Sequence, residues 1–518
     1  MLDFSRSGTK RIYKSPTRKL VKFFENSRSQ WKAKCKKAKR TIKQLKHRVR
    51  FLETSKAVLK SRVKKLKAEL AQIKAREAER EIDRNKLDGP PSEETGDIRL
   101  FGITPPYHTY SIGHIMLFVL LVLSSATSLR GASRSMEIVI LFLGFEFSIP
   151  SWFSGRLWLL RLGYYKFKRE KEKANDWAWI VDHTVQVGAE KCLVVLGIRL
   201  CDLPAPGNSL THEDVEPIDL IPTRHSNGGV VFQQLSETIE KTGVPRVIVG
   251  DHGSDIKSGI DRFCEEHDET CYIYDIKHKT AAVLKHELQN DETWQDFLQL
   301  AVKTKKRVQQ TALAPLAPPN QRAKARYMNV NSMIEWGSKV LVFVDKYVAN
   351  ANTTFDKVQV DEKLGWVTEF RVPLDQWQEL LRVVTTVECF VREQGISNES
   401  HIELEKLEGL EVHTKQTERV RDTLLGFVKE QSLKAKPNER LIGSSEVIES
   451  VFGKLKRFEQ DQAKSGFTGL LLSVGAIVSK TTSEVVQKAM EAVRTKDVID
   501  WCKETLGQSV QSKRREAF

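Results

Sequence analysis

The sequence predicts a multidomain protein of the α and α/β classes. A basic N-terminal coiled coil and a small helical domain are expected to precede a mixed-sheet core that an all-helical insertion interrupts. Three patterns lead to this prediction: an apolar seven-residue repeat in the basic N-terminal part, strands alternating with helices between residues 177 and 276, and an almost wholly helical pattern from residue 279 to about 440. The 518 residues exceed the roughly 100 to 200 residues of one domain, so several folded units are expected.

Positive charge is concentrated in the N-terminal part of the chain. Residues 1 to 90 contain 29 Lys and Arg against 9 Asp and Glu, a net charge of +20, whereas the whole chain carries +16, which leaves about −4 for the remainder. A basic arm on a nearly neutral body is typical of proteins that bind a polyanion, either nucleic acid or an anionic membrane surface. Seven scattered cysteines without a CxxC pair indicate a reducing cytoplasm rather than a disulfide framework.

The N-terminal repeat predicts a coiled coil. From Trp31 to Ile73 the apolar positions step alternately by four and three residues, and Lys56 is the one break in this seam. Six such heptads without Gly or Pro predict a coiled coil over residues 28–86 and a homodimer formed through it, with residues 1–27 as a basic tail. The lysine and arginine excess on its other faces favours phosphate binding over a merely solvated surface. A polar segment containing Pro and Gly then predicts a linker over residues 87–99.

Three helices are expected in residues 100–172. The pattern predicts them at Tyr110–Ser125, at Ser128–Gly144 and from Pro150 through about Leu162, with Ser151 as the N-cap of the third. Three short helices with a sharp turn before the last are typical of a helix-turn-helix domain, which places its last helix in the DNA major groove. The residues expected to contact DNA are Ser151, Trp152, Arg156, Arg161, Lys166, Lys168 and Arg169.

The core begins near residue 173. Two β-rich runs, Trp177–Val187 and Lys191–Leu200, are separated by a turn and predict a hairpin. A helix, a buried strand, a second helix and another strand are expected next, at Val230–Thr242, Pro245–Gly250, Ile256–His267 and Cys271–Ile276. Elements in this order predict a mixed sheet with helices packed against it.

The core is expected in two pieces. Its first part covers residues 173–290, and a helical insertion follows over residues 291–440, broken by Leu313–Pro319 and by Gly365. Residues 441–518 then complete the core with further helices. Trp336 and Trp366 of the insertion are expected to pack in its interior, the alternative being stacking on an unpaired base.

Two acidic residues in the core suggest a metal site. Asp182 lies inside the first strand among apolar neighbours, where a carboxylate is costly to bury without a partner or a metal. Asp251 directly follows the strand VIVG, and ligands gather at the carboxyl end of parallel strands. Phosphodiester chemistry uses two Mg²⁺ ions about 4 Å apart, held by carboxylates that converge from different parts of a rigid frame.

The pattern from Trp177 to His278 resembles the DDE-type transposases, which have a ribonuclease-H-like catalytic core. In that family the first acid lies on the first strand, the second follows the fourth strand, and the third lies on a helix after the fifth strand, often beyond a large insertion. The matching third acid here is Glu449 in SSEVIESVFGKLK.

The surroundings of Glu449 resemble the bacterial insertion-sequence transposases. The spacing from Glu449 to Lys456 matches the Glu-to-Lys spacing of their Y-R-E-K signature, but its Tyr and Arg are absent and Ser445 stands where Arg would be. Glu446 therefore remains open as the third acid. Lys456 is expected to hold a phosphate or to form a salt bridge.

The resemblance implies the chemistry. Asp182, Asp251 and Glu449 are expected to be catalytic and to hold two Mg²⁺ ions, for which Mn²⁺ can substitute. The expected reaction is hydrolysis at a transposon end, followed by attack of the freed 3′-hydroxyl on target DNA, without a covalent protein intermediate. Transposon ends and target DNA are then the partners, with no small-molecule substrate and no membrane, in a bacterial cytoplasm near the nucleoid.

Three further residues are secondary candidates. Asp275 and His278, in YDIKH at the end of the last strand, are expected to line the site because related transposases often carry an Asp or His there. Asp255 is the substitute for Asp251.

Two other functions remain open. The first is a catalytically inactive transposase-derived DNA-binding protein. The second is a membrane-associated coiled-coil protein that uses the apolar runs Ile115–Leu123 and Ile138–Leu143. Each run falls well short of the ~18 to 20 apolar residues of a spanning helix, which favours buried helices of a small domain.

Overall fold

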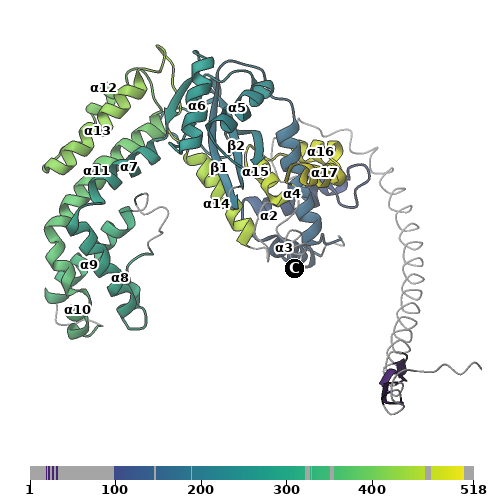
Figure 1. The fold of residues 1–518 in the computed structure, drawn as a ribbon, viewed down its shortest axis with the longest axis horizontal. Helices are drawn as coiled ribbons and strands as arrows, with labels where there is room; N and C mark the ends of the chain where they lie inside the picture. The colour runs from purple at the N-terminus through teal and green to yellow at the C-terminus, as the bar shows by residue number, and fades with distance from the viewer. Residues whose placement is uncertain are drawn as a thin grey trace, which may run out of the picture. The chain divides into compact units, whose positions relative to one another are not determined.

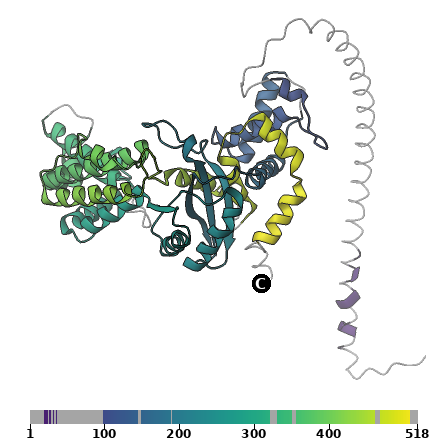
Figure 2. The same ribbon diagram turned by 90° about the horizontal axis from the view of Figure 1, so that it is seen from above.

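The structure is a computed structural model that describes residues 98–506, except 145–147, 188–189, 321–326, 328–329, 350–354 and 461–467, together with isolated positions between 19 and 35. The chain divides into two compact units, Met1–Glu94 and Thr95–Phe518. Almost all of the expected coiled coil and most of the expected linker lie outside the described residues, so the homodimer stays a prediction. Figures 1 and 2 show the second unit, in which helices surround one sheet.

The helical domain at the start of the second unit has the three expected helices. A short 3-10 helix η1 (Ile98–Gly102) precedes α2 (Ile112–Leu123), α3 (Leu129–Phe142) and α4 (Trp152–Lys168). Ser151 caps α4 as predicted, because its side chain accepts a hydrogen bond from the backbone N–H of Ser154 at 3.1 Å. Whether these helices form a DNA-binding helix-turn-helix stays a prediction.

Helix α4 continues about six residues beyond its expected end because it packs along the C-terminal helices. These are the 3-10 helix η7 (Gly469–Leu472), α15 (Ser473–Ile477), α16 (Ser483–Ala492) and α17 (Thr495–Leu506). At the closest approach a Cβ added to Gly163 would lie 1.8 Å from the carbonyl oxygen of Leu472, so only glycine fits there. The C-terminal helices thus join the helical domain to the core.

A mixed five-stranded sheet forms the core, in the order β3-β2-β1-β4-β5. The antiparallel strands are β1 (Trp177–Val187), β2 (Glu190–Arg199) and β3 (Glu216–Thr223), whereas β4 (Val247–Gly250) and β5 (Cys271–Tyr274) run parallel to β1. This arrangement is consistent with the ribonuclease-H-like core that the resemblance implies.

Strand β3 was not expected from the sequence. Its segment EPIDLIPT contains Pro217 and Pro222, which read as loop residues because proline cannot donate a backbone hydrogen bond. The strand lies at the edge of the sheet, where missing donors can face away from the ladder, and its pairing with β2 shifts register beside Pro217.

The two faces of the sheet pack against different helices. Trp179, Val181 and Ile248 belong to a core shared with α5 (Gly228–Thr242) and α6 (Ser254–Glu266). The alternate positions, such as Ile180 and Val249, belong to the larger core on the opposite face. Helix α14 (Glu446–Gln460) contacts β1 and lies beside it in Figure 1. The part of the core that follows the insertion therefore packs against the first strand of the sheet.

The insertion is helical, as predicted. Its helices, with α7 leading into it from β5, are α7 (Ile276–Leu288), α8 (Glu292–Val308), α9 (Val330–Ala349), α10 (Lys357–Leu364), α11 (Arg371–Gln394), α12 (Ser400–Glu405) and α13 (Lys415–Ser432). Short 3-10 helices η3 (Ala314–Leu316) and η6 (Gly365–Phe370) stand at the two expected breaks.

Trp336 and Trp366 pack inside the insertion, as the sequence favoured. Trp336 is 8% exposed and its indole N–H donates to the Leu316 carbonyl at 2.9 Å. The indole N–H of Trp366 donates to Thr304 Oγ1 at 2.8 Å. Both rings contact Phe297, so they are structural rather than free to stack on a base.

The two apolar runs considered as membrane segments lie in α2 and α3, helices of 12 and 14 residues. Within the part of the chain that the structure describes, no helix combines the length and the apolar character needed to cross a membrane.

Candidate metal site

Three aspartates lie at the same level of three neighbouring strands: Asp182 inside β1, Asp251 directly after β4 and Asp275 directly after β5. The last residue pairs of the parallel strands are Val181 with Gly250 and Gly250 with Tyr274. Asp182, Asp251 and Asp275 each come one residue later, so they form a row across strands that lie about 4.8 Å apart. Asp182 and Asp251 each follow by two residues a side chain of the larger core, Ile180 and Val249, so they point to the same face of the sheet. Helix α14 contacts β1 on that face.

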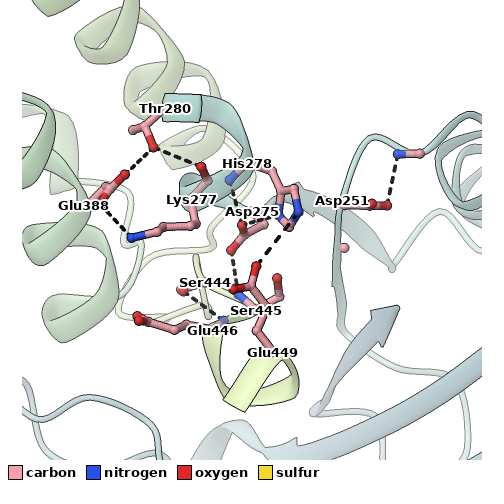
Figure 3. A network of polar contacts seen from close by, with 12 residues as sticks. Asp251, Asp275, Lys277, His278, Thr280, Glu388, Ser444, Ser445, Glu446 and Glu449 are labelled. Carbon is pink, nitrogen blue, oxygen red and sulfur yellow. Dashed lines mark hydrogen bonds and ion pairs between the residues drawn. The ribbon is translucent and has the colours of Figure 1, made fainter. Parts of the chain in front are cut away.

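Glu449 approaches this row from α14. Its Oε1 lies 3.9 Å from Nε2 of His278, which belongs to the first turn of α7 (Figure 3). Ligand atoms of Asp275, His278 and Glu449 all lie within 4.8 Å of one another. The sheet, α7 and α14 thus bring together residues from three distant parts of the sequence.

Asp275 is the organising residue of this group. It is fully buried, and its carboxylate accepts hydrogen bonds from the backbone N–H of His278 at 2.9 Å and from that of Ser445 at 2.6 Å. It also contacts Nδ1 of His278 at 2.7 Å. A second link, from the Ile276 N–H to the Gly443 carbonyl at 3.1 Å, lies beside it. These hydrogen bonds let Asp275 join α7 to α14, and Asp275 also belongs to the group of residues that could hold a metal ion.

The carboxyl of Asp182 is strongly perturbed. Burial is the largest cause, and with the nearby charges of Asp251 and Glu449 it raises the pKa of Asp182 to about 7, while the His183 N–H and the charge of His278 oppose the rise. Asp182 is therefore close enough to Asp251 and Glu449 for their negative charges to disfavour its ionised form. Acids that repel one another in this way are costly until a cation joins them, and carboxylate oxygens are suitable ligands for a divalent metal ion.

His278 carries the compensating charge. Burial alone would lower its pKa, but the hydrogen bond to Asp275 and the charges of Asp275, Glu449 and Asp251 raise the pKa of His278 to about 9. Burial also raises the pKa of Glu449, and His278 opposes that rise. The raised pKa favours the protonated ring, which pairs with Glu449, whereas the neutral ring could offer Nε2 to a metal ion.

Asp255 is separated from the other acids. Its carboxylate pairs with Lys191 at 2.7 Å and lies 3.8 Å from Nδ1 of His183. His183 follows Asp182 on β1, so the two side chains point to opposite faces of the sheet. Despite its burial, the hydrogen bond from Lys191 helps to lower the pKa of Asp255 to about 2. Asp255 thus acts in an ion pair, and the structure does not place it with Asp182.

The two candidates for the third acid occupy different positions. Glu446 is the first residue of α14, and its carboxylate lies 3.5 Å from the guanidinium of Arg392 on α11. Glu449, one turn later, faces His278 instead. The geometry favours Glu449. Lys456 lies two turns beyond Glu449 on the same helix and is exposed.

Two of the residues expected to bind DNA are buried, which corrects the prediction for them. Arg161 is 8% exposed and donates to the carbonyls of Val493 and Met490, both at 2.6 Å. Lys166 is fully buried and donates to the carbonyls of Val478 and Ser479 at 2.8 and 3.0 Å. Both cations satisfy carbonyls at turns between the C-terminal helices, a use that a basic helix in the sequence does not distinguish from phosphate binding.

The other five expected DNA contacts have mixed surroundings. Trp152 is 42% exposed, with the Arg130 guanidinium 5.4 Å from its ring, and Lys168 is exposed. Ser151 is exposed but caps α4, Arg156 is partly buried, and Arg169 is paired with Glu216.

Comparison with known protein families finds no match, and comparison with curated proteins finds none either. Among solved structures the chain is similar to the Drosophila P element transposase strand transfer complex, at 11% identity and a TM-score of 0.33, over 82% of this chain and 100% of that chain. A likeness this distant does not establish what the chain does.

Proposed function

We propose that this chain is a DDE-type transposase that binds DNA and catalyses metal-dependent phosphodiester hydrolysis and strand transfer. The observation that carries the proposal is the perturbed carboxyl of Asp182, whose pKa is raised to about 7 by burial and by the charges of Asp251 and Glu449. Buried acids perturbed by their neighbours are typical of functional sites.

These three carboxylates would hold two Mg²⁺ ions, with Mn²⁺ able to substitute. The bound ions supply an activated oxygen nucleophile and relieve charge on the reacting phosphate. Asp182 and Asp251 are fixed by the sheet, and Glu449 is fixed by α14, whose start is bound to Asp275. His278 holds the Glu449 carboxylate by charge, and Asp275 holds the His278 ring through Nδ1. No protein nucleophile is required.

DNA would be bound outside the site as well. The basic residues 1–90 supply positive charge, and exposed Trp152 and Lys168 lie at the two ends of α4. The coiled coil would make the protein a homodimer. The narrower assignment to bacterial insertion-sequence transposases rests on the spacing from Glu449 to Lys456 and remains part of the proposal.

Cleavage of DNA tests the proposal. The substrate is a supercoiled plasmid carrying the DNA that flanks the reading frame, with Mg²⁺ or Mn²⁺ added. Asp182→Asn, Asp251→Asn and Glu449→Gln should each lower the nicking rate by more than about 100-fold, because changes to residues beyond the ligands themselves typically cost about 10- to 100-fold. DNA affinity should be unchanged.

Asp255→Asn is the matched control, since it removes a neighbouring carboxylate that is held in an ion pair with Lys191. A wild-type protein that binds DNA without nicking it would favour the inactive DNA-binding relative. Undiminished nicking by Asp182→Asn would overturn the proposal.

A further inference from the structure

We infer that the helical insertion sets the geometry of the candidate metal site through two side chains of α11, Glu388 and Arg392, which act as positioning residues. The inference rests on the proposed function, because the residues that they position are His278 and Glu449. Neither Glu388 nor Arg392 contacts the reacting atoms; each acts through a helix that carries a site residue.

Glu388 holds the first turn of α7. Its carboxylate accepts a hydrogen bond from the hydroxyl of Thr280 and lies 3.4 Å from Nζ of Lys277 (Figure 3). Lys277 and Thr280 flank His278 in the sequence, so these two contacts fix the rotation of the turn that directs His278 toward Glu449. The Glu388 side chain is only 16% exposed, which limits screening of the contact by water.

Arg392 lies against the first turn of α14, while its Nη2 pairs with Glu393 at 2.8 Å. Its Nη1 lies 3.5 Å from Oε2 of Glu446. Glu446 and Glu449 are three residues apart, so they lie on neighbouring positions of one helix face. A shift of Glu446 along or around α14 would therefore move Glu449 with it.

The two contacts come from one face of one helix. Glu388 and Arg392 are four residues apart on α11, which places them about one turn, or ~6 Å, from each other. They meet the two helices whose site residues face each other across the 3.9 Å gap between His278 Nε2 and Glu449 Oε1. Helix α11 thus bridges both sides of that gap.

The far half of α11 belongs to the interior of the insertion. Trp377 is 2% exposed, and its ring lies 4.8 Å from Trp294 and 5.3 Å from Phe297. With 24 residues, α11 is roughly 36 Å long and rigid along its axis. A displacement of the insertion is therefore transmitted to the spacing of His278 and Glu449.

Glu388→Gln and Arg392→Gln test the inference, with Arg371→Gln as the matched control. Arg371 lies on the same helix and pairs with Asp345 at 2.7 Å, within the insertion. Two quantities are measured: Mn²⁺ affinity by electron paramagnetic resonance, and kcat and KM for plasmid nicking. The two glutamine variants should lose about 10- to 100-fold in Mn²⁺ affinity or kcat, as is typical for groups behind metal ligands, with KM for DNA unchanged.

The control should match the wild type, and Arg392→Lys, which keeps the charge, should recover most of the loss. This recovery separates positioning from a general loss of structure, and it remains informative if a glutamine variant unfolds. Wild-type affinity and kcat in both glutamine variants would overturn the inference alone. Failure of the proposed function is recognised separately. In that case Mn²⁺ binding would be absent from the wild type or would be unaffected by Asp182→Asn, and the inference would be overturned with the proposed function.

Discussion

Removing the charge of Asp182 should stabilise the metal-free protein while it abolishes the proposed activity. The pKa of this carboxyl is raised from 3.8 to about 7, chiefly by burial and by Asp251. The folded state then binds a proton that the unfolded state has already lost, so the free energy of unfolding falls as the pH rises from about 4 to 7. The cost is complete above pH 7.

The magnitude follows from the pKa. A tenfold change in proton affinity is about 1.4 kcal/mol, so the full cost is about 4 kcal/mol. Since the side chain keeps some contact with water, a measured gain of about 2 to 4 kcal/mol is expected for Asp182→Asn at pH 8. At pH 4 the gain should nearly vanish, because the wild-type carboxyl is protonated in the folded state.

Urea unfolding in EDTA at pH 4 and pH 8 measures this difference. Asp255→Asn is the control of opposite sign: the pKa of Asp255 is lowered to about 2, so its ionised form stabilises the fold above pH 4 and its removal should cost about 1 to 2 kcal/mol at pH 8. Added Mg²⁺ should stabilise the wild type and not Asp182→Asn. Equal stability of Asp182→Asn and the wild type at pH 8 in EDTA would refute the reasoning.

Two further predictions concern His278 and Gly163. His278 has its pKa raised to about 9, so its charge stabilises the fold fully below pH 6.5, and this contribution is lost as the pH rises through 9. The stability difference between the wild type and His278→Gln in EDTA should therefore shrink between pH 6.5 and 9.5; a constant difference would contradict the charged form. Gly163→Ala places a methyl group 1.8 Å from the Leu472 carbonyl and should destabilise the protein by about 1 to 3 kcal/mol or more. Faster proteolytic cleavage in α4 or η7 would show this loss of stability. A free energy of unfolding equal to that of the wild type would contradict the close packing.

The sequence predicted those parts of the fold whose pattern is local. The strands that carry Asp182 and precede Asp251 are apolar runs, and the two acids come to the same level once the strands are placed side by side. The edge strand β3 was missed because Pro217 and Pro222 have the signature of a loop, and only its pairing with β2 makes the segment a strand.

The remaining errors concern contacts between distant segments. Arg161 donates to the Val493 carbonyl, which lies 332 residues away in the sequence, and nothing near Arg161 indicates that acceptor. Asp275 lies with His278 and Glu449, as its position at the end of a strand predicted. Its hydrogen bond to Ser445, 170 residues away, could not be predicted from the local sequence.

The hydrogen bond between Asp275 and Ser445 bears on which changes of the insertion the fold tolerates. The polypeptide leaves the sheet at Asp275 and comes back at Ser445, 170 positions later, yet the two points are 2.6 Å apart, with Ile276 and Gly443 joined next to them. Because the two ends of this inserted segment lie together, a change in its length has only a small entropic cost. The parts of the insertion remote from the core can therefore change in length, whereas Asp275, Ser445 and the end of α11 that contacts α7 and α14 are constrained together.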